Sequence, residues 1–237
     1  MSGGPRKTVT IVSFSGIDGA GKTTQICALQ NWLRELGLTS RLLTFWDNVV
    51  VAPRFREAAS RTAFKGDQGI GSPEKPLHRR DKNVTSRPVT AMRFFFYFAD
   101  AFNLRRKIIQ LKISQLKKTD PDVVIFDRYI YDELANLPLK GWLVRVYIHL
   151  VLKLSPKPEI AYVIDADPAA AFQRKPEYPL EFLLKNRESY LALSQLTGHL
   201  TVIEPLSIEE TKLRIKEVFL QHVSRPVAGL SEAPALE

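Results

Sequence analysis

Residues 13–25, SFSGIDGAGKTTQ, place three glycines and a lysine between a run of β-forming residues and a helix. The preceding residues 8–14 (TVTIVSF) are rich in β-branched side chains and end before a loop containing glycine, which predicts a strand. After the loop, apolar residues recur with the spacing of one helical face between Thr23 and Leu36, and Gly37 then ends the pattern. The stretch is therefore predicted to run from a strand through a glycine loop into a helix.

The same stretch matches the pattern G-x-x-x-x-G-K-[ST], which is typical of loops that bind nucleotide phosphates. Glycines permit positive φ angles and close backbone approach, so successive N–H groups can surround a polyanion at the start of the following helix. Lys22 would reach the outer phosphates of ATP, and the Thr23 hydroxyl would bind Mg²⁺. An ordinary glycine turn is the alternative, but the position between strand and helix favours the phosphate loop. The residues expected to contact the nucleotide are Gly16, Asp18, Gly19, Ala20, Gly21, Lys22, Thr23 and Thr24.

Further β-forming segments alternate with helical ones along the chain. The apolar runs VVIFD and EIAYVID are typical of strands buried in a parallel sheet. Asp167 with Pro168, and a capping box from Ser207 to Glu210, are helix-start signals. The alternation predicts an α/β fold in which helices cover both faces of a parallel sheet. The predicted strands cover residues 8–14, 40–46, 123–127, 159–165 and 200–204.

The run VVIFD also brings Asp127 to the carboxyl end of its strand, where ligands of parallel sheets bind. An aspartate at this place can hold Mg²⁺ directly or through water. The alternative is that Asp127 only caps the next helix. Because a phosphate loop is present as well, we favour the metal role, and Thr23 and Asp127 are the predicted Mg²⁺ ligands.

Four segments together resemble the thymidylate kinases, a branch of the nucleoside monophosphate kinases. They are GIDGAGKTT, FDRYIYD, VIDADPAAAFQR and FLLKNRESYLAL, they occur in the family's order, and the resemblance covers most of residues 8–222. It implies a P-loop NTPase fold with a five-stranded parallel sheet. It also implies transfer of the γ-phosphoryl group of ATP, with Mg²⁺, to a nucleoside monophosphate, of which dTMP is the first candidate.

The resemblance also implies roles for single residues. Lys22 and Arg128 would bind phosphoryl groups, and Asp18 would meet the sugar hydroxyl of the acceptor. A turn role for Asp18 and a solvated surface role for Arg128 are the alternatives. Some members place a catalytic arginine in the phosphate loop, where this chain has Ala20, so Arg174 in a lid is the expected source of that charge. The predicted catalytic residues are therefore Lys22, Arg128 and Arg174.

The acceptor-binding half departs from the family at two places, and each departure removes an arginine. Phe45, Trp46 and Asp47 stand where the family has R-E-P, and residues 97–101 (YFADA) stand where it has F-x-A-x-R. Tyr97 could stack on a base, which would make Asp18, Tyr97 and Arg128 the acceptor site, or it could belong to the core. The cations that could replace the missing arginines are Arg54, Arg56, Arg79, Arg80, Lys82 and Arg93.

These departures leave alternatives for the function. The acceptor could be another monophosphate or a non-nucleotide metabolite, and the chain could instead be a nucleotide-binding regulatory protein. The formal charge of +9 and the pI near 9.7 favour anionic partners such as nucleotides, nucleic acid or anionic lipid. Charge is the one feature that suggests nucleic acid, whereas the motifs suggest nucleotides. We therefore expect nucleotides as partners and consider nucleic acid unlikely.

The domain organisation combines composition with the resemblance. Composition predicts a flexible N-terminus at 1–7, a mobile loop at 62–87 and a flexible tail at 223–237. The resemblance implies one kinase domain at 8–222 with a lid near 173–180. No signal peptide precedes the first strand, which predicts a cytoplasmic protein.

Three further segments bear on packing and partners. The aromatic run at 91–104 contains Arg93 and Asp100 and is too short to span a membrane, so a buried helix and no membrane partner are expected. Residues 139–154 are apolar around most of a helix, which predicts deep packing or the face of a homodimer. The single cysteine, Cys27, is expected to be a buried thiol.

Overall fold

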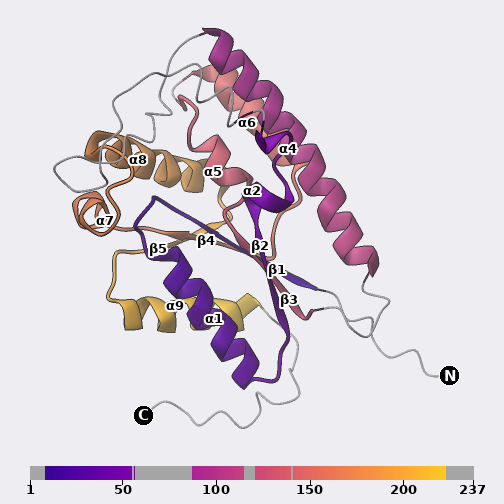
Figure 1. Cartoon of the computed structure of the whole chain (residues 1–237), viewed down its shortest axis with the longest axis vertical. Coiled ribbons are helices and arrows are strands. Elements are labelled where there is room, and N and C mark those ends of the chain that lie inside the picture. The colour runs from indigo at the N-terminus through magenta and orange to yellow at the C-terminus, as the bar shows by residue number, and fades with distance from the viewer. Residues whose placement is uncertain (1–8, 55, 57–86, 115–120, 140, 223–237) are drawn as a thin grey trace.

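The computed structural model describes residues 9–54, 56, 87–114, 121–139 and 141–222. The expected flexible termini and nearly all of the expected loop at 62–87 lie outside these residues. Five parallel strands form one sheet in the order β2-β3-β1-β4-β5. Figure 1 labels the strands at the centre of the molecule. The expected five-stranded parallel sheet is confirmed. The strands are β1 (Thr10–Ser15), β2 (Ser40–Thr44), β3 (Val123–Asp127), β4 (Ile160–Ile164) and β5 (Leu200–Ile203).

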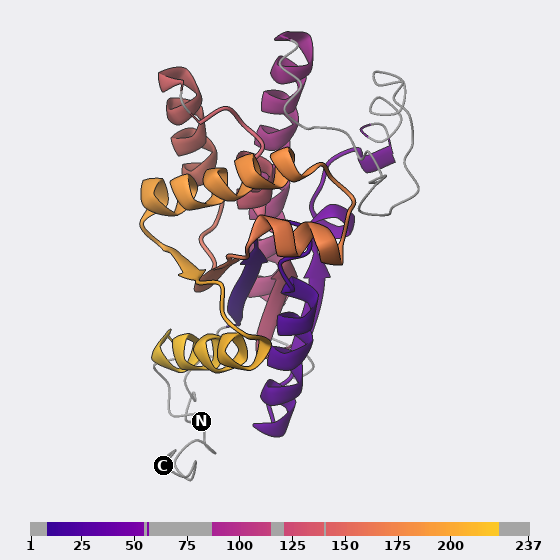
Figure 2. The ribbon, with the colours of Figure 1, turned by 90° about the vertical axis from the view of Figure 1, so that its left-hand side faces the viewer.

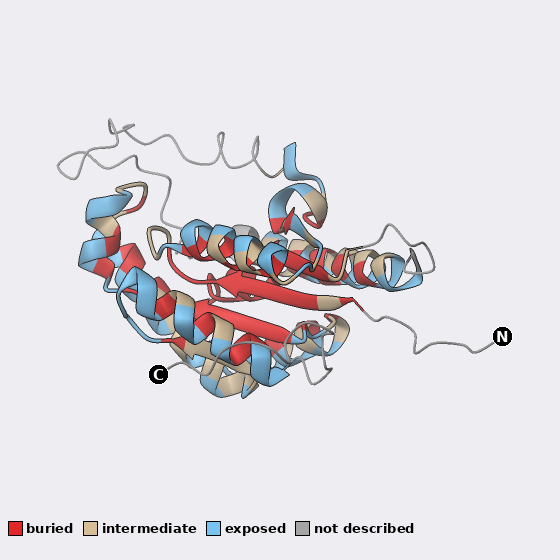
Figure 3. Ribbon diagram, turned by 90° about the horizontal axis from the view of Figure 1, so that it is seen from below, coloured by how far each residue is buried: buried red, intermediate tan, exposed pale blue. Residues whose placement is uncertain are grey.

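Helices cover both faces of the sheet, because successive strand residues point to opposite sides. In β3, Val123 and Ile125 belong to the apolar cluster under α1 and α9, whereas Val124 and Phe126 belong to the cluster on the other face. Figure 3 shows the buried strands between these two layers, and Figure 2 shows α9 and α1 at the end opposite α4 and α6. The helices are α1 (Lys22–Glu35), α2 (Phe45–Asn48), α4 (Arg87–Ser114), α5 (Ile130–Leu134), α6 (Trp142–Leu154), α7 (Pro168–Arg174), α8 (Leu180–Thr197) and α9 (Ile208–His222).

Local start signals place two of these helices. Asp167 is the N-cap of α7 and accepts a hydrogen bond from the amide of Ala170 at 2.8 Å, with Pro168 in the first turn. Before α9, the amide of Ser207 donates to Glu210 Oε2 at 3.0 Å, and the amide of Glu210 donates to Ser207 Oγ at 3.3 Å. The predicted N-cap and the predicted capping box are both confirmed.

One strand boundary and two expectations about burial were wrong. The strand predicted at 40–46 ends at Thr44, because the chain turns there into α2, where the Asn48 side chain bonds to the Thr44 carbonyl. Cys27 is exposed, since α1 turns Ile26 and Leu29 inward instead. The aromatic part of α4 is buried on one side only, and Phe95, Phe98 and Phe102 are exposed.

The carboxyl ends of β1, β2 and β3 meet at one edge of the sheet. Asp127, the last residue of β3, lies opposite Phe14 of β1 and Thr44 of β2. The amide of Arg128 continues this contact and donates to the carbonyl of Phe14 at 2.9 Å. The glycine loop after Ser15 and the Asp127–Arg128 pair are therefore neighbours, although more than a hundred residues separate them.

None of the described helices combines the length and the apolar composition that crossing a membrane requires.

Gly19 and Gly37 share a left-handed backbone, with φ of 81° and 72°, and differ in what surrounds them. A Cβ on Gly19 would lie 2.4 Å from the carbonyl oxygen of Ala171 in α7, whereas a Cβ on Gly37 would meet no atom within 4 Å. Gly37→Ala should lower the free energy of unfolding by about 1 kcal/mol. Gly19→Ala should lower it by about 2 kcal/mol more, because the backbone of α7 must also move. Urea denaturation measures both losses, and equal losses would contradict close contact between the loop and α7.

Candidate active site

The glycine loop presents backbone amides at the start of α1. Gly16, Gly19 and Gly21 all have positive φ, which turns the backbone back on itself. The hydrogen bonds among the described residues include none donated by the amides of Gly19, Gly21 or the first turn of α1 at residues 22–24. No acidic side chain lies in that first turn. Free amides and the positive end of a helix dipole suit a bound anion, so the loop fits nucleotide phosphates.

Lys22 is buried beneath this loop. Its Nζ donates to the carbonyl oxygens of Gly16 and Ile17, both at 2.8 Å. Burial lowers the pKa of Lys22 from 10.5 to about 8, and repulsion by Arg128 adds to this, while Asp18 and two further carboxylates oppose it. Burying the charge of this amine costs free energy. Among the described residues its hydrogen bonds go to loop carbonyls, and it can exchange these partners for phosphate oxygens.

Arg128 lies next to Asp18 of the loop. Its Nη2 donates to Asp18 Oδ1, and its Nη1 donates to Asp132 Oδ1 at 3.3 Å. Burial opposes the positive charge, but the carboxylates of Asp18 and Asp132 outweigh burial and raise the pKa of Arg128. The backbone of Arg128 is left-handed, with φ of 68°, which is uncommon for a residue that is not glycine. The structure therefore brings the predicted residues Asp18 and Arg128 together as an ion pair.

Asp132 was missed by the sequence prediction although it organises this site. Its two carboxylate oxygens accept bonds from Ser15 Oγ at 2.6 Å, the Tyr129 amide at 2.9 Å and the Tyr190 hydroxyl at 2.7 Å, besides Arg128. These donors come from the end of β1, the start of α5 and the middle of α8. The available signal was the spacing of Arg128 and Asp132 in FDRYIYD, which puts them four residues apart.

Asp127 is at the position that a Mg²⁺ ligand requires, at the end of β3 and beside β1. The N-cap of α5 is Tyr129, so Asp127 does not cap that helix. Among the described residues no three His, Cys, Asp or Glu side chains gather into a metal site. Mg²⁺ bound with substrate phosphates needs only one or two protein ligands, so Thr23 and Asp127 fit this ion.

Arg174 ends α7 beside the phosphate loop. Its Nε donates to the carbonyl oxygen of Gly19 at 3.0 Å, and its side chain is exposed. Arg187 of α8 instead makes a two-pronged pair with Asp165 after β4, at 2.6 and 2.7 Å. Of these two arginines, Arg174 is therefore the one that contacts the predicted nucleotide loop.

Tyr97 does not lie at the surface of the site. Its side chain is 3% exposed in the core beneath α4, and burial, together with the charge of Glu133, raises its pKa. The structure therefore favours a core role for Tyr97 over base stacking. Ala101, where the family motif has arginine, is fully buried as well.

Arg56, one of the candidate replacement cations, is held by two buried carboxylates. Its Nη1 lies 2.6 Å from Asp100 Oδ2 and its Nη2 lies 3.3 Å from Glu133 Oε2, while the rings of Trp46, Phe96 and Tyr97 surround the guanidinium. Burial raises the pKa of Asp100 to about 6, although Arg56 opposes this. Arg56 therefore joins α4 to α5 through its pairs with Asp100 and Glu133. Arg79, Arg80 and Lys82 lie outside the described residues.

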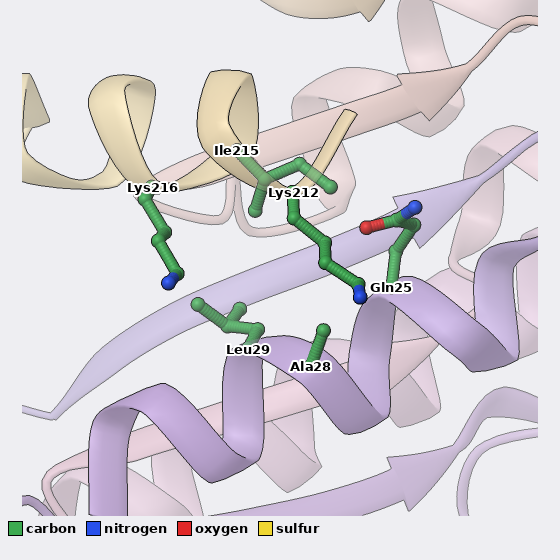
Figure 4. A pocket seen from close by; sticks show the side chains of 6 residues that line it. All are labelled: Gln25, Ala28, Leu29, Lys212, Ile215 and Lys216. Atoms are coloured by element: carbon green, nitrogen blue, oxygen red, sulfur yellow. The ribbon is translucent and has the colours of Figure 1, made fainter. Parts of the chain in front are cut away.

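A small cavity between α1 and α9 is not part of this site. Figure 4 shows that it lies between the two helices, and its volume of about 10 Å³ holds at most one water molecule. Its lining is Gln25, Ala28, Leu29, Lys212, Ile215 and Lys216.

A parallel sheet of this strand order, with a glycine loop and a buried lysine between β1 and α1, defines the chain as a P-loop α/β protein. Solved structures agree with this class. The thymidylate kinase of Ehrlichia chaffeensis superposes with a TM-score of 0.56 at 19% identity, over 90% of this chain and 99% of its own. The thymidylate kinase of Candida albicans superposes with a TM-score of 0.57 at 16% identity, over 90% of this chain and 92% of its own.

Two relatives found by sequence comparison are probable thymidylate kinases. A probable thymidylate kinase of Methanosphaera stadtmanae is 26% identical over 205 residues, which are 84% of this chain and 91% of the relative. One of Methanothermobacter thermautotrophicus is 26% identical over 218 residues, 89% of this chain and 94% of the relative. No model of a known protein family matches the chain. The chain is therefore similar over most of its length to probable thymidylate kinases, as its four motifs indicated.

Because the pKa of Lys22 is lowered to about 8, and bound phosphates would raise it again, ATP binding above pH 8 requires proton uptake. Above pH 8 the association constant for ATP should therefore fall by up to about tenfold more per pH unit than it does below pH 8. Lys22→Arg keeps its charge throughout this range and should abolish the fall. Calorimetric titration on both sides of pH 8 measures the effect, and an equal fall in the Arg variant would contradict it.

Asp132→Asn should lower the free energy of unfolding by about 3 kcal/mol, because Arg128 stays buried while one of its carboxylates disappears. Tyr190→Phe removes a single donor to Asp132 and should cost only about 1.5 kcal/mol. Urea denaturation of both variants gives the comparison. Losses of equal size would mean that Asp132 does not hold Arg128 in solution.

Proposed function

We propose that the protein is an ATP-dependent phosphotransferase that moves the γ-phosphoryl group of ATP to a nucleoside monophosphate, with dTMP as the first candidate. The observation that carries the proposal is the juxtaposition of the phosphate loop with the Asp18–Arg128 pair at one edge of the sheet. One element suits the donor phosphates, and the other offers a carboxylate and a cation to an acceptor. The distant thymidylate kinase relatives support the same acceptor class.

The donor would be held mainly by the backbone. The amides of Gly19 and of residues 21–24 would bind the phosphates, and Lys22 would exchange its bonds with Gly16 and Ile17 for bonds with phosphate oxygens. Thr23 and Asp127 would hold Mg²⁺, which when bound offsets the charge of the phosphate oxygens. Arg174 would neutralise charge on the transferred group, and its hydrogen bond to the carbonyl of Gly19 supports this role.

The acceptor would meet Asp18 and Arg128. The Asp18 carboxylate can accept a hydrogen bond from a sugar hydroxyl, and Arg128 can bind a phosphoryl oxygen with a donor that its two carboxylates leave free. Asp132 keeps the guanidinium in place while this happens. The protein thus contributes positioning and electrostatic stabilisation, which is what phosphoryl transfer requires.

A nucleotide-binding regulatory protein is the second candidate. The observation that favours it comes from two described residues on the acceptor side: Ala101 is buried, and Arg56 is paired with Asp100 and Glu133. Such a protein would bind ATP but transfer no phosphoryl group.

A coupled assay of ADP release, run with ATP, Mg²⁺ and each nucleoside monophosphate in turn, separates the candidates. We expect stimulation by a monophosphate, strongest with dTMP, over the rate with ATP alone. ATP binding without stimulation by any monophosphate would favour the regulatory protein or a non-nucleotide acceptor.

Two variants control this assay. Arg174→Ala should lower kcat by about a hundredfold with little change in the Kd of ATP, because its charge is needed only as the transition state forms. Lys175→Ala removes the adjacent exposed cation and should leave kcat within about twofold of the parent. An unchanged kcat in the Arg174 variant would remove this residue from the mechanism.

A further inference from the structure

Helix α7 carries Arg174 at its end but has little packing of its own. It has seven residues, and its buried residues are Pro168 and Ala171. A helix this short is not stable by itself, and packing of apolar side chains is what usually fixes a helix in a protein. The position of α7, and with it that of Arg174, must therefore be set largely by other contacts.

Asp165, between β4 and α7, makes such a contact from the side of the sheet. Its amide donates to the carbonyl of Ile203 at 2.9 Å, which extends the pairing of β4 with β5 by one residue. Its side chain is 8% exposed, and its Oδ1 accepts a hydrogen bond from the amide of Ala166 at 2.9 Å. The carboxylate of Asp165 is therefore fixed relative to the sheet.

Arg187 of α8 binds this carboxylate with two hydrogen bonds. Its Nε donates to Asp165 Oδ1 at 2.6 Å and its Nη2 donates to Asp165 Oδ2 at 2.7 Å. Two parallel bonds fix the direction of a guanidinium as well as its distance. The pair joins the two ends of the segment 166–186, which contains α7 and the start of α8, and these two helices pack side by side (Figure 1).

The segment that this pair closes is the one that touches the phosphate loop. The carbonyl oxygen of Ala171 lies so close to the loop that a Cβ on Gly19 would be 2.4 Å from it. Arg174 Nε donates to the carbonyl oxygen of Gly19 at 3.0 Å. Because Arg174 is at the far end of α7 from β4, a small rotation of the helix would move its guanidinium away from the loop.

We propose that Arg187 is a positioning residue: paired with Asp165, it holds α7 against the phosphate loop and so keeps Arg174 beside the group that is transferred. Arg187 acts through Arg174 and does not itself contact the nucleotide. Displacing a reacting group by about 1 Å from a distant site can lower a rate substantially. The kinetic part of this inference rests on the proposed function, whereas the hold on α7 does not depend on any reaction.

Two other roles for the pair compete with this one. The first is stability alone, but the side chain of Arg187 is 35% exposed, and ion pairs that solvent reaches contribute little to the free energy of unfolding. The second is direct binding of a phosphate by Arg187, in which case Asp165 would compete with the nucleotide for the guanidinium. The Asp165 variant separates this second role from positioning.

Steady-state kinetics with ATP, Mg²⁺ and the best monophosphate acceptor test the positioning role. Arg187→Gln should lower kcat by about twentyfold and leave the Kd of ATP within about twofold of the parent. Asp165→Asn should lower kcat to a similar extent, and the double variant should fall no further, because each change removes the same interaction. Arg187→Lys keeps the charge without the two-pronged geometry, so its kcat should lie between those of Arg187→Gln and the parent.

A second background tests whether Arg187 acts through Arg174. In Arg174→Ala, the further change Arg187→Gln should alter kcat by less than about twofold, because the group that is positioned is already absent. A role in stability alone would not produce this dependence. Arg214→Gln is the matched control: it breaks the pair of Arg214 with Glu217 on α9, at 2.9 Å, and should leave kcat within about twofold of the parent.

Hydrogen exchange without nucleotide tests the hold on α7 independently of activity. The amides of α7 should exchange at least about fivefold faster in Arg187→Gln than in the parent, while those of α9 stay unchanged. If the parent transfers no phosphoryl group to any monophosphate, the proposed function fails, and faster exchange in α7 still supports the hold on this helix.

Three results would overturn the proposal. One is unchanged exchange of the α7 amides in Arg187→Gln, whatever the activity. Another is a kcat that Arg187→Gln leaves at the parental value, or lowers further in the Arg174→Ala background. The third is a fall in kcat for Arg187→Gln together with a parental or higher kcat for Asp165→Asn, which would make Arg187 a direct phosphate ligand.

Discussion

The site depends on one buried carboxylate, that of Asp132. It accepts hydrogen bonds from the end of β1, the start of α5 and the middle of α8, and it pairs with Arg128 after β3. A buried carboxylate is stable only where donors surround it, so the four elements must keep their relative positions for the charge to be tolerated. The position of Arg128, and with it the arrangement of Asp18, follows from this requirement.

Charge balance divides the site into two ends. At the donor end, Lys22 stands under free amides, and its charge is costly until an anion arrives. At the acceptor end, Arg128 and Arg56 are each held by two carboxylates, contributed in part by the consecutive residues Asp132 and Glu133. Under the proposed function, the donor end would therefore receive a polyanion, whereas the acceptor end would recognise its ligand chiefly through direction and shape.

The parts that the sequence predicted are those with local causes. Glycine spacing, β-branched runs and capping residues act within a few positions, so the loop, all five strands, the cap at Asp167 and the capping box before α9 were found within two residues. The α6 segment also showed its apolar character. The Asp132 network and the Arg56 cluster could not be found in full, because their remaining partners are 44 to 117 residues apart. Only Arg128 and Tyr129 lie within four residues of Asp132 among its described partners. Cys27 and Tyr97 depended on which way a helix faces, which packing decides.

Arg128 connects the chemistry to the backbone in another way. Its left-handed φ of 68° is one that glycine adopts freely and an L-residue adopts at a cost of about 1–2 kcal/mol. The guanidinium is thus kept at a position where the main chain alone would prefer glycine. Exchange to glycine at this codon would relieve the main chain but leave the Asp132 carboxylate buried without its cation, so selection for heat resistance alone would retain the arginine.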